Sequence, residues 1–303
     1  MNNNSSKNKK CELRHTNFEF YQKFDNKKLQ KCLLCEKSCF LTKSNPGFCG
    51  VNIYDEMNNN CIVFNMPISV NIDPIEKKPI YNFLQNSFTL SIGTYGCNFF
   101  CFWCQNHEIS QKRVFSTDEM TVFKPEVFPD LAKKYNCRSI SYTYNEPTVF
   151  YPYAREIGLL AKKEGLKNIF VTNGYQTEYI IDDMSKWVDA CNVDLKGFNK
   201  EKHLKYTGAN RDYILRNINL LYKKGVYIEL TTLIVPGFND DLEEMHKLID
   251  FILSVSENIY WHISRFFPRY RMQETPVTDI EFMNRVKDLA KSKGLKNVFL
   301  GNV

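Results

Sequence analysis

The residues best suited to chemistry are three cysteines, Cys97, Cys101 and Cys104, which follow one another with C-x3-C-x2-C spacing. Three thiolates on one short loop can ligate three irons of a [4Fe-4S] cluster and leave the fourth iron open to a substrate. Zinc is the alternative occupant, because His107 stands where it could complete a Cys3His site. These three cysteines, called the triplet below, therefore predict a metal centre.

A second group of cysteines, the quartet, precedes the triplet at Cys32, Cys35, Cys39 and Cys49. Four thiolates can close a structural zinc site or ligate an auxiliary iron-sulfur cluster, and the spacing does not decide between them. The chain has 11 cysteines in 303 residues and starts with a polar stretch, residues 1–10, in place of an apolar leader. This pattern indicates metal or redox chemistry in a cytoplasmic protein rather than a disulfide framework.

Repeated β/α units are expected to position these residues. From residue 88 onward, short β-rich runs alternate with longer amphipathic runs, which indicates a parallel sheet with helical crossovers. Seven strands with right-handed crossovers favour an α/β fold of the partial (β/α)6 TIM-barrel type. The expected strands are 88–92, 139–143, 168–172, 188–194, 227–234, 260–266 and 296–300, and the expected helices include 152–164, 212–224, 241–254 and 280–293.

Three segments are expected along the chain. Residues 1–30 form a tail and lead-in, of which 1–10 is predicted to be disordered because it is nearly all Asn, Ser and Lys. Residues 31–87 form a small cysteine-rich metal-binding module with a connector, and residues 88–303 form the barrel.

The loops that follow the expected strands share an unusual composition. They begin GTYGC, YNEP, TNGY, DLKG, VPGFND and RFFPRY, so each is rich in Gly, Asn, Asp, Arg or Cys. One such loop could be an ordinary turn. Functional residues of β/α barrels collect at the C-terminal ends of the strands, so six such loops after six strands predict one shared site.

The triplet and the order of these loops resemble the radical S-adenosylmethionine (SAM) superfamily. In that superfamily, SAM chelates the open iron of a [4Fe-4S] cluster through its amino and carboxylate groups. One electron from the reduced cluster then cleaves SAM to a 5′-deoxyadenosyl radical. The resemblance implies that SAM is bound by residues at the matching motif positions: Trp103, Asn145, Glu146, Asn173, Asp194 and Lys196.

The resemblance also implies a role for each motif. Trp103 would lie near the adenine, the Asn145–Glu146 pair would serve the SAM amino group, and Asn173 would contact the ribose. The Asn145–Glu146 pair could at the same time cap a helix that starts at Pro147.

The resemblance implies that the Asp-Leu-Lys motif, which ends the fourth expected strand, would serve the SAM carboxylate. Lys196 would neutralise that carboxylate, while Asp194 would orient Lys196 or hold a monovalent cation. Backbone groups of the Val-Pro-Gly segment, 235–237, would lie beside the adenine.

Longer strings are similar to those of glycyl-radical-enzyme activases such as pyruvate formate-lyase activating enzyme, and closer still to the AmmeMemoRadiSam-system radical SAM enzymes, the AmrS family. They include GCNFFCFWCQNHEISQ, YTYNEPTVF, NVDLKGF, TTLIVPGFND and WHISRFFPRYRM. The resemblance implies hydrogen abstraction from a protein or large substrate. It also implies reduced ferredoxin or flavodoxin as electron donor and an AMMECR- or Memo-type protein as partner.

One position departs from the activases. A His near the end of their sixth strand helps to bind the SAM carboxylate, and Phe267 stands at the corresponding position here. His262 lies five residues earlier, and an odd offset on a strand points it to the other face.

Composition limits the other possibilities. The formal net charge is +6, but lysines and acidic residues are intermixed, which is typical of a solvated basic surface rather than a nucleic-acid partner. No apolar run approaches the roughly 18 residues of a membrane span. A non-catalytic zinc-binding interaction protein is the alternative to the enzyme, and iron with acid-labile sulfide at the triplet would separate the two.

Overall fold

The computed structural model describes residues 19–24, 28–56, 60–114 and 121–303. The expected disordered stretch 1–10 lies outside them. Two sheets make up the strand content of the described residues: an eight-stranded sheet and a three-stranded one. Among the same residues, no helix is long and apolar enough to cross a membrane.

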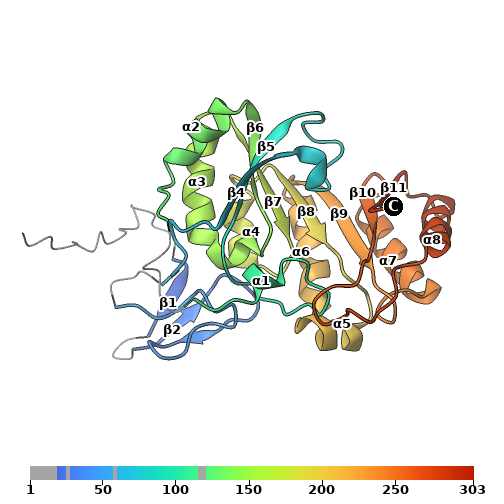
Figure 1. The fold of residues 1–303 in the computed structure, drawn as a ribbon, viewed down its shortest axis with the longest axis horizontal. Helices are drawn as coiled ribbons and strands as arrows, with labels where there is room; N and C mark the ends of the chain where they lie inside the picture. The colour runs from blue at the N-terminus through green and yellow to red at the C-terminus, as the bar shows by residue number, and fades with distance from the viewer. Residues whose placement is uncertain (1–18, 25–27, 57–59, 115–120) are drawn as a thin grey trace, which may run out of the picture.

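The large sheet is the partial barrel that the sequence predicts. Its strand order, β11-β10-β9-β8-β7-β6-β5-β4, follows the chain, and the two end strands do not pair with each other, so the barrel stays open. Strands β5 to β11 are parallel (Figure 1). They are β5 (Phe88–Gly93), β6 (Cys137–Tyr142), β7 (Lys167–Thr172), β8 (Ala190–Asp194), β9 (Tyr227–Ile234), β10 (Tyr260–Arg265) and β11 (Asn297–Gly301).

Helices follow each parallel strand except the last and give the β/α order. Five consecutive helices begin at a Thr, Asn or Asp whose side chain accepts a bond from a backbone N–H of the first turn. The α-helices are α1 (His107–Ser110), α2 (Val127–Lys134), α3 (Tyr151–Lys163), α4 (Glu178–Met184), α5 (Lys200–Thr207), α6 (Arg211–Lys223), α7 (Leu242–Val255) and α8 (Ile280–Ser292). Two short 3-10 helices are η1 (Ile75–Lys77) and η2 (Pro147–Phe150).

The seven expected strands and four expected helices are present, with ends that shift by one or two residues. The sequence analysis does not predict β4 (Ser69–Pro74), which pairs antiparallel with β5 at the edge of the large sheet. Its side chains are mostly half-buried or exposed, so no buried run marks it. The sheet therefore starts within the stretch that the sequence assigns to a connector.

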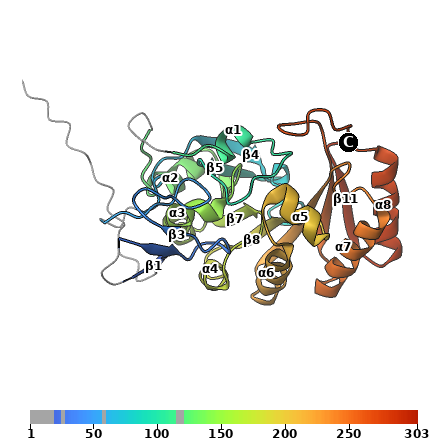
Figure 2. The same cartoon turned by 90° about the horizontal axis from the view of Figure 1, so that it is seen from below.

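The N-terminal residues form a small antiparallel sheet of β1 (Tyr21–Lys23), β2 (Gln30–Cys32) and β3 (Phe40–Leu41). This sheet lies beside α3 and α4 in both ribbon views (Figures 1 and 2). It is fastened to the loop between β7 and α4, because Glu36 N donates to Tyr175 O at 3.1 Å and Thr177 Oγ1 donates to Leu33 O at 2.6 Å. Its apolar residues, such as Leu34 and Leu41, belong to the same core cluster as those of the barrel.

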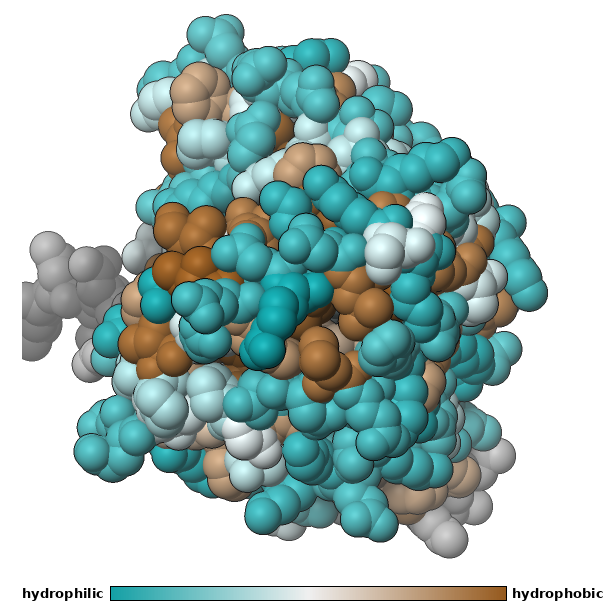
Figure 3. Space-filling view, turned by 90° about the vertical axis from the view of Figure 1, so that its right-hand side faces the viewer, coloured by the Kyte–Doolittle hydropathy of each residue, from teal (hydrophilic) through white to brown (hydrophobic). Residues whose placement is uncertain are grey.

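The surface over the β11 and α8 end of the barrel mixes hydrophilic and apolar side chains (Figure 3). Among the described residues, the exposed large apolar side chains include Phe267 at 45% and Val303 at 66%. Phe267 therefore lies at the surface, just beyond the end of β10.

Candidate SAM and iron-sulfur site

The triplet lies on the loop that leaves β5 at its C-terminal end. Phe99 and Trp103 are buried and anchor this loop, and the backbone N–H groups of Phe100 and Phe102 donate to Thr207 O and Tyr206 O of α5. Cys101 is buried, while Cys97 and Cys104 are half-buried. The apolar residues between the cysteines therefore fix the loop against the barrel.

Cys97 and Cys101 sit in an environment that disfavours a charged thiolate. Burial raises the pKa of Cys97 well above its ordinary value, and Glu146 and Cys101 nearby raise it further. Burial also raises the pKa of Cys101 to about 12, although Lys196 acts against this. Within the described residues, no three His, Cys, Asp or Glu side chains yet stand close enough to hold a metal ion. Metal binding would have to draw the sulfurs together and release their protons.

Asn145, at the end of β6, is committed to the loop before the triplet. Its Nδ2 donates to Gly96 O at 2.7 Å and to Thr94 Oγ1 at 3.1 Å, and its Oδ1 accepts from Thr94 N at 3.0 Å. Both hydrogens of the amide and its carbonyl oxygen are thus engaged. Asn145 ties the second strand end to the first.

Glu146 is buried and connects the C-terminal end of β6 to that of β7. Its Oε1 accepts from Thr148 N at 3.0 Å, which caps η2, and from Thr172 Oγ1 at 2.7 Å. Its Oε2 accepts from Asn173 N at 2.7 Å. Burial raises the pKa of Glu146, while these donors act to lower it. The helix-cap role considered for this residue is therefore present.

Asn173, at the end of β7, reaches the triplet loop. Its Nδ2 donates to Asn98 Oδ1 at 2.7 Å, and its Oδ1 accepts from Tyr175 N at 3.1 Å. Asn98 follows Cys97 directly and is 1% exposed. Asn98 is not among the site residues that the sequence motifs predict. Its position inside the cysteine motif is the one signal that could have marked it.

Asp194 and Lys196 form an ion pair at the end of β8. The Lys196 side chain is 9% exposed, and the second oxygen of Asp194, Oδ1, is buried without a hydrogen-bond partner among the described residues. Burial lowers the pKa of Lys196, but Asp194 and the Cys101 thiol outweigh it and hold that pKa above its ordinary value. Lys196 therefore stays protonated beside the triplet, with Asp194 compensating its charge.

Trp103 connects the triplet to the loop after β9. Its ring centroid lies 4.6 Å from that of Phe238, which follows the Val-Pro-Gly segment. Asn239 fixes this loop to the preceding one, since its Nδ2 donates to Lys196 O at 2.7 Å and its Oδ1 accepts from Val235 N at 2.7 Å. Sequence reasoning missed Asn239 as a separate contributor, although it belongs to the VPGFND string.

The loop after β10 also contacts the triplet. Arg271 N donates to Phe102 O at 2.9 Å, and the Tyr270 ring stacks on His107 with centroids 4.5 Å apart. The Nδ1 atom of His107, the fourth ligand in the zinc alternative, lies 3.2 Å from Cys104 O. The loops after five consecutive strands, β6 to β10, thus reach the triplet loop by direct contact or by charge.

His262 is separate from this site. It is buried within β10, and its Nε2 lies 2.6 Å from Glu229 Oε2 on β9. Glu229 also accepts from the backbone N–H groups of Tyr81 and Asn82 at 2.9 Å. Both His262 and Glu229 lie in the first half of their strands, whereas the triplet faces the C-terminal ends.

The sequence profile described as the radical SAM superfamily matches residues 91–252, which is more than half of the chain. The chain belongs to the radical SAM superfamily. The matched stretch starts within β5 and includes the triplet and the loops after β5 to β9. A radical SAM enzyme carries a [4Fe-4S] cluster and SAM, and it needs a reductant.

Relatives of this radical SAM chain include an uncharacterised protein of Methanocaldococcus jannaschii, 36% identical over 291 residues, with 94% of this chain and 84% of that protein covered. The pyruvate formate-lyase 1-activating enzyme of Escherichia coli is 27% identical over 160 residues, covering 48% of this chain and 65% of that enzyme. A putative glycyl-radical enzyme activating enzyme of M. jannaschii is 28% identical over 54% of this chain and 62% of its own length. The chain thus spans less than two thirds of these two activating enzymes.

Solved structures share the fold at low sequence identity. A radical SAM methyltransferase from Sphaerobacter thermophilus has a TM-score of 0.56 at 14% identity, with 72% of this chain and 67% of that chain covered. SuiB of Streptococcus suis bound to S-adenosylmethionine has a TM-score of 0.55 at 13% identity, with 71% and 50% covered. These likenesses concern the architecture of the radical SAM barrel.

Proposed function

We propose that Cys97, Cys101 and Cys104 hold the [4Fe-4S] cluster of this radical SAM enzyme and that the loops after β6 to β9 bind SAM beside it. The observation that carries the proposal is the convergence of those loops on the triplet. Asn145, Asn173 and the ring of Phe238 each contact a residue within or next to the cysteine motif. Such convergence is what a ligand bridging the strand ends requires.

The residues present fit the cluster. The donor set supplies three thiols, which matches a cluster with one iron left open to SAM. A buried cation, Lys196, stands next to Cys101, and Asp194 Oδ1 is left without a partner beside it among the described residues. An unpaired buried acceptor is costly, so its presence suits a bound ligand that supplies a donor. When bound, the cluster supplies the electron that cleaves SAM reductively.

Different side chains are proposed to bind different parts of SAM. Lys196 pairs with the SAM carboxylate in this proposal, and its ion pair with Asp194 supports a fixed position for the ammonium group. Trp103 and Phe238 offer apolar surface to the adenine. Asn145 and Glu146 use most of their hydrogen-bonding capacity on neighbouring loops. Their role is therefore to fix backbone carbonyl groups that accept from the SAM amino group. Asn173 Nδ2 makes one hydrogen bond within the described residues, so its second amide hydrogen can serve the ribose.

The test is substitution of Cys101 by Ala. Anaerobically reconstituted protein should carry about four irons and four sulfides at the triplet. With dithionite and SAM it should release methionine and 5′-deoxyadenosine, whereas Cys101→Ala should lose both the cluster and the products. Cys137→Ser is the matched control, because Cys137 is buried at the start of β6 and lies outside both cysteine groups. SAM cleavage by Cys101→Ala at the wild-type rate would refute the assignment.

We propose further that the radical abstracts hydrogen from a protein or other large substrate, as glycyl-radical-enzyme activases do, and that the chain is a member of the AmrS family that its longer strings resemble. The activating enzymes among the relatives support this class of reaction and keep glycyl-radical-enzyme activation as the second candidate. Reduced ferredoxin or flavodoxin is the proposed electron donor, and an AMMECR- or Memo-type protein the proposed partner. A uniformly deuterated partner should transfer deuterium to 5′-deoxyadenosine, measured by mass spectrometry. Transfer from a glycyl-radical enzyme instead would favour the second candidate.

A further inference from the structure

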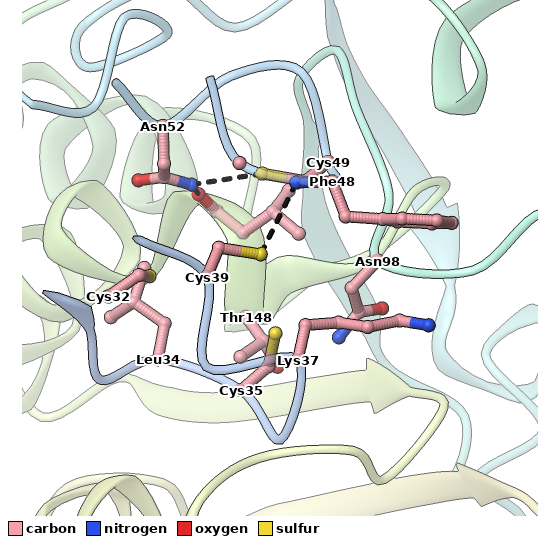
Figure 4. A pocket seen from close by; sticks show the side chains of 12 residues that line it. Cys32, Leu34, Cys35, Lys37, Cys39, Phe48, Cys49, Asn52, Asn98 and Thr148 are labelled. Carbon is pink, nitrogen blue, oxygen red and sulfur yellow. Dashed lines mark hydrogen bonds between the residues drawn. The ribbon is translucent and has the colours of Figure 1, made fainter. Parts of the chain in front are cut away.

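The four cysteines of the quartet line a single pocket (Figure 4). Cys32 ends β2, and its backbone N–H donates to Cys39 O at 2.9 Å, so the β2–β3 hairpin brings these two together with Cys35 in the turn between them. Cys49 comes from the loop after β3, where Gly47 N donates to Asn52 O at 2.7 Å. The local backbone therefore assembles the four thiols from two turns.

Hydrogen-bond donors already point at these sulfurs. Phe48 N donates to Cys39 Sγ at 3.4 Å, and Asn52 Nδ2 donates to Cys49 Sγ at 3.3 Å. A neutral thiol is a weak acceptor, whereas a metal-bound thiolate is a strong one. The N–H donors at Cys39 and Cys49 are therefore the outer contacts that suit a metal-thiolate site.

Asn98 gives an independent indication. It lines the pocket, is 1% exposed, and its Nδ2 has no well-formed hydrogen bond within the described residues although it lies beside the Cys35 thiol. A buried amide nitrogen is costly to leave unpaired. A thiolate at Cys35 would supply the missing acceptor. The cationic Lys37 side chain also lines the pocket, with Nζ 4.3 Å from the centre of the Phe48 ring. It can offset part of the negative charge of several thiolates.

We propose that Cys32, Cys35, Cys39 and Cys49 bind a single zinc ion. The pocket that they help to line has room for about one water molecule, which is room for a single ion. Four thiols without an open position make a closed tetrahedral site of the structural kind, with sulfurs about 2.3 Å from the metal. Because no three of the described cysteines yet stand at such distances, zinc binding must rotate these side chains inward.

The proposed zinc site lies directly against the triplet loop. A Cβ on Gly96, directly before Cys97, would lie 2.6 Å from Cys49 O and 2.8 Å from Val51 Cγ1. Asn98 spans the two cysteine groups, since its Oδ1 accepts from Asn173 Nδ2 while its Nδ2 lies beside Cys35. The zinc module therefore positions the triplet loop and is not a remote appendage. The inference that the zinc module positions the triplet loop rests on the proposed function of the triplet, whereas the inference of zinc binding does not.

Metal analysis of the full-length chain tests the proposal, with zinc and iron counted in each protein after expression with zinc and anaerobic reconstitution with iron and sulfide. Wild-type protein should contain about one zinc and four irons per chain. Cys35→Ser should lose the zinc, Cys101→Ala should lose the irons and keep the zinc, and Cys137→Ser should keep both. Loss of iron from Cys101→Ala tests the cluster at the triplet, and loss of zinc from Cys35→Ser tests the zinc site at the quartet. Failure of one assignment is therefore distinguishable from failure of the other.

Two results would overturn the zinc assignment. One is loss of about four irons from Cys35→Ser with its zinc unchanged, which would show an auxiliary cluster. The other is wild-type protein without zinc. If Cys35→Ser fails to fold, the zinc of Cys101→Ala is replaced by cobalt. This variant lacks the triplet cluster, so the cobalt spectrum reports on the quartet alone. Four-thiolate tetrahedral coordination should produce an intense thiolate-to-cobalt charge-transfer band, and absence of this band would refute the site.

Discussion

Replacing Gly96 by Ala probes the contact between the quartet module and the triplet loop. Gly96 has φ +89°, and the closest atom that a Cβ would meet is the backbone oxygen of Cys49 at 2.6 Å. A backbone atom cannot rotate away as the end of a flexible side chain can. The substitution therefore forces either the triplet loop or the quartet module to move.

The expected magnitude has two parts. An L-residue with a left-handed backbone costs about 1–2 kcal/mol relative to Gly. Overpacking against a buried, well-packed neighbour adds roughly 1–3 kcal/mol. Gly96→Ala should therefore lower the free energy of unfolding by about 2–5 kcal/mol. Gly225→Ala is the matched control, because Gly225 has φ +77° and a Cβ at this position would meet nothing within 4 Å among the described residues. The free energy of unfolding of Gly225→Ala should fall only by the backbone contribution of about 1–2 kcal/mol.

Urea unfolding followed by circular dichroism measures both variants under identical metal loading, and iron is counted in parallel. Gly96→Ala should be less stable than Gly225→Ala by about the overpacking amount, roughly 1–3 kcal/mol. It should also retain less iron, because the triplet loop is displaced, whereas the control should retain wild-type iron. Equal stability losses in the two variants, with equal iron, would show that the module does not press on the triplet loop.

Two further predictions concern charge. Lys196→Met removes a charge-assisted contact worth about 1.5–3 kcal/mol, so SAM affinity in anaerobic equilibrium dialysis should fall roughly ten- to a hundredfold with iron content unchanged. Unaltered affinity would remove Lys196 from the SAM site. Burial opposes ionisation of Asp73, but hydrogen bonds from Lys77, Lys78 and Tyr144 outweigh it and hold the Asp73 pKa well below its ordinary value. A lowered folded-state pKa gives stability that is present above the unfolded pKa of about 3.9 and lost as the pH falls below it. The melting temperature of Asp73→Asn should therefore decline less than that of wild type between about pH 5 and pH 2, and identical profiles would contradict the Asp73 contribution.

The sequence by itself determined the class of the fold and the order of its strands. Alternation of β-rich and amphipathic runs is a local property, and each expected strand from 88–92 to 296–300 is present in the sheet. The spacing of Cys97, Cys101 and Cys104 is equally local, because one short loop carries all three. Short elements with weak periodicity, such as β4 and α4, could not be predicted in this way.

The tertiary structure alone decided which side chains meet. Asn145 is engaged with the loop before the triplet and Glu146 with the end of β7, at separations of 26 to 51 residues along the chain. The quartet lies against Gly96 and Asn98, although nothing in its spacing indicates a neighbour. Such pairings depend on how β/α units curve and on which residues face each other across loops. Local propensity carries no information about either. The contact of the quartet with Gly96 and Asn98 therefore becomes visible only in the folded chain.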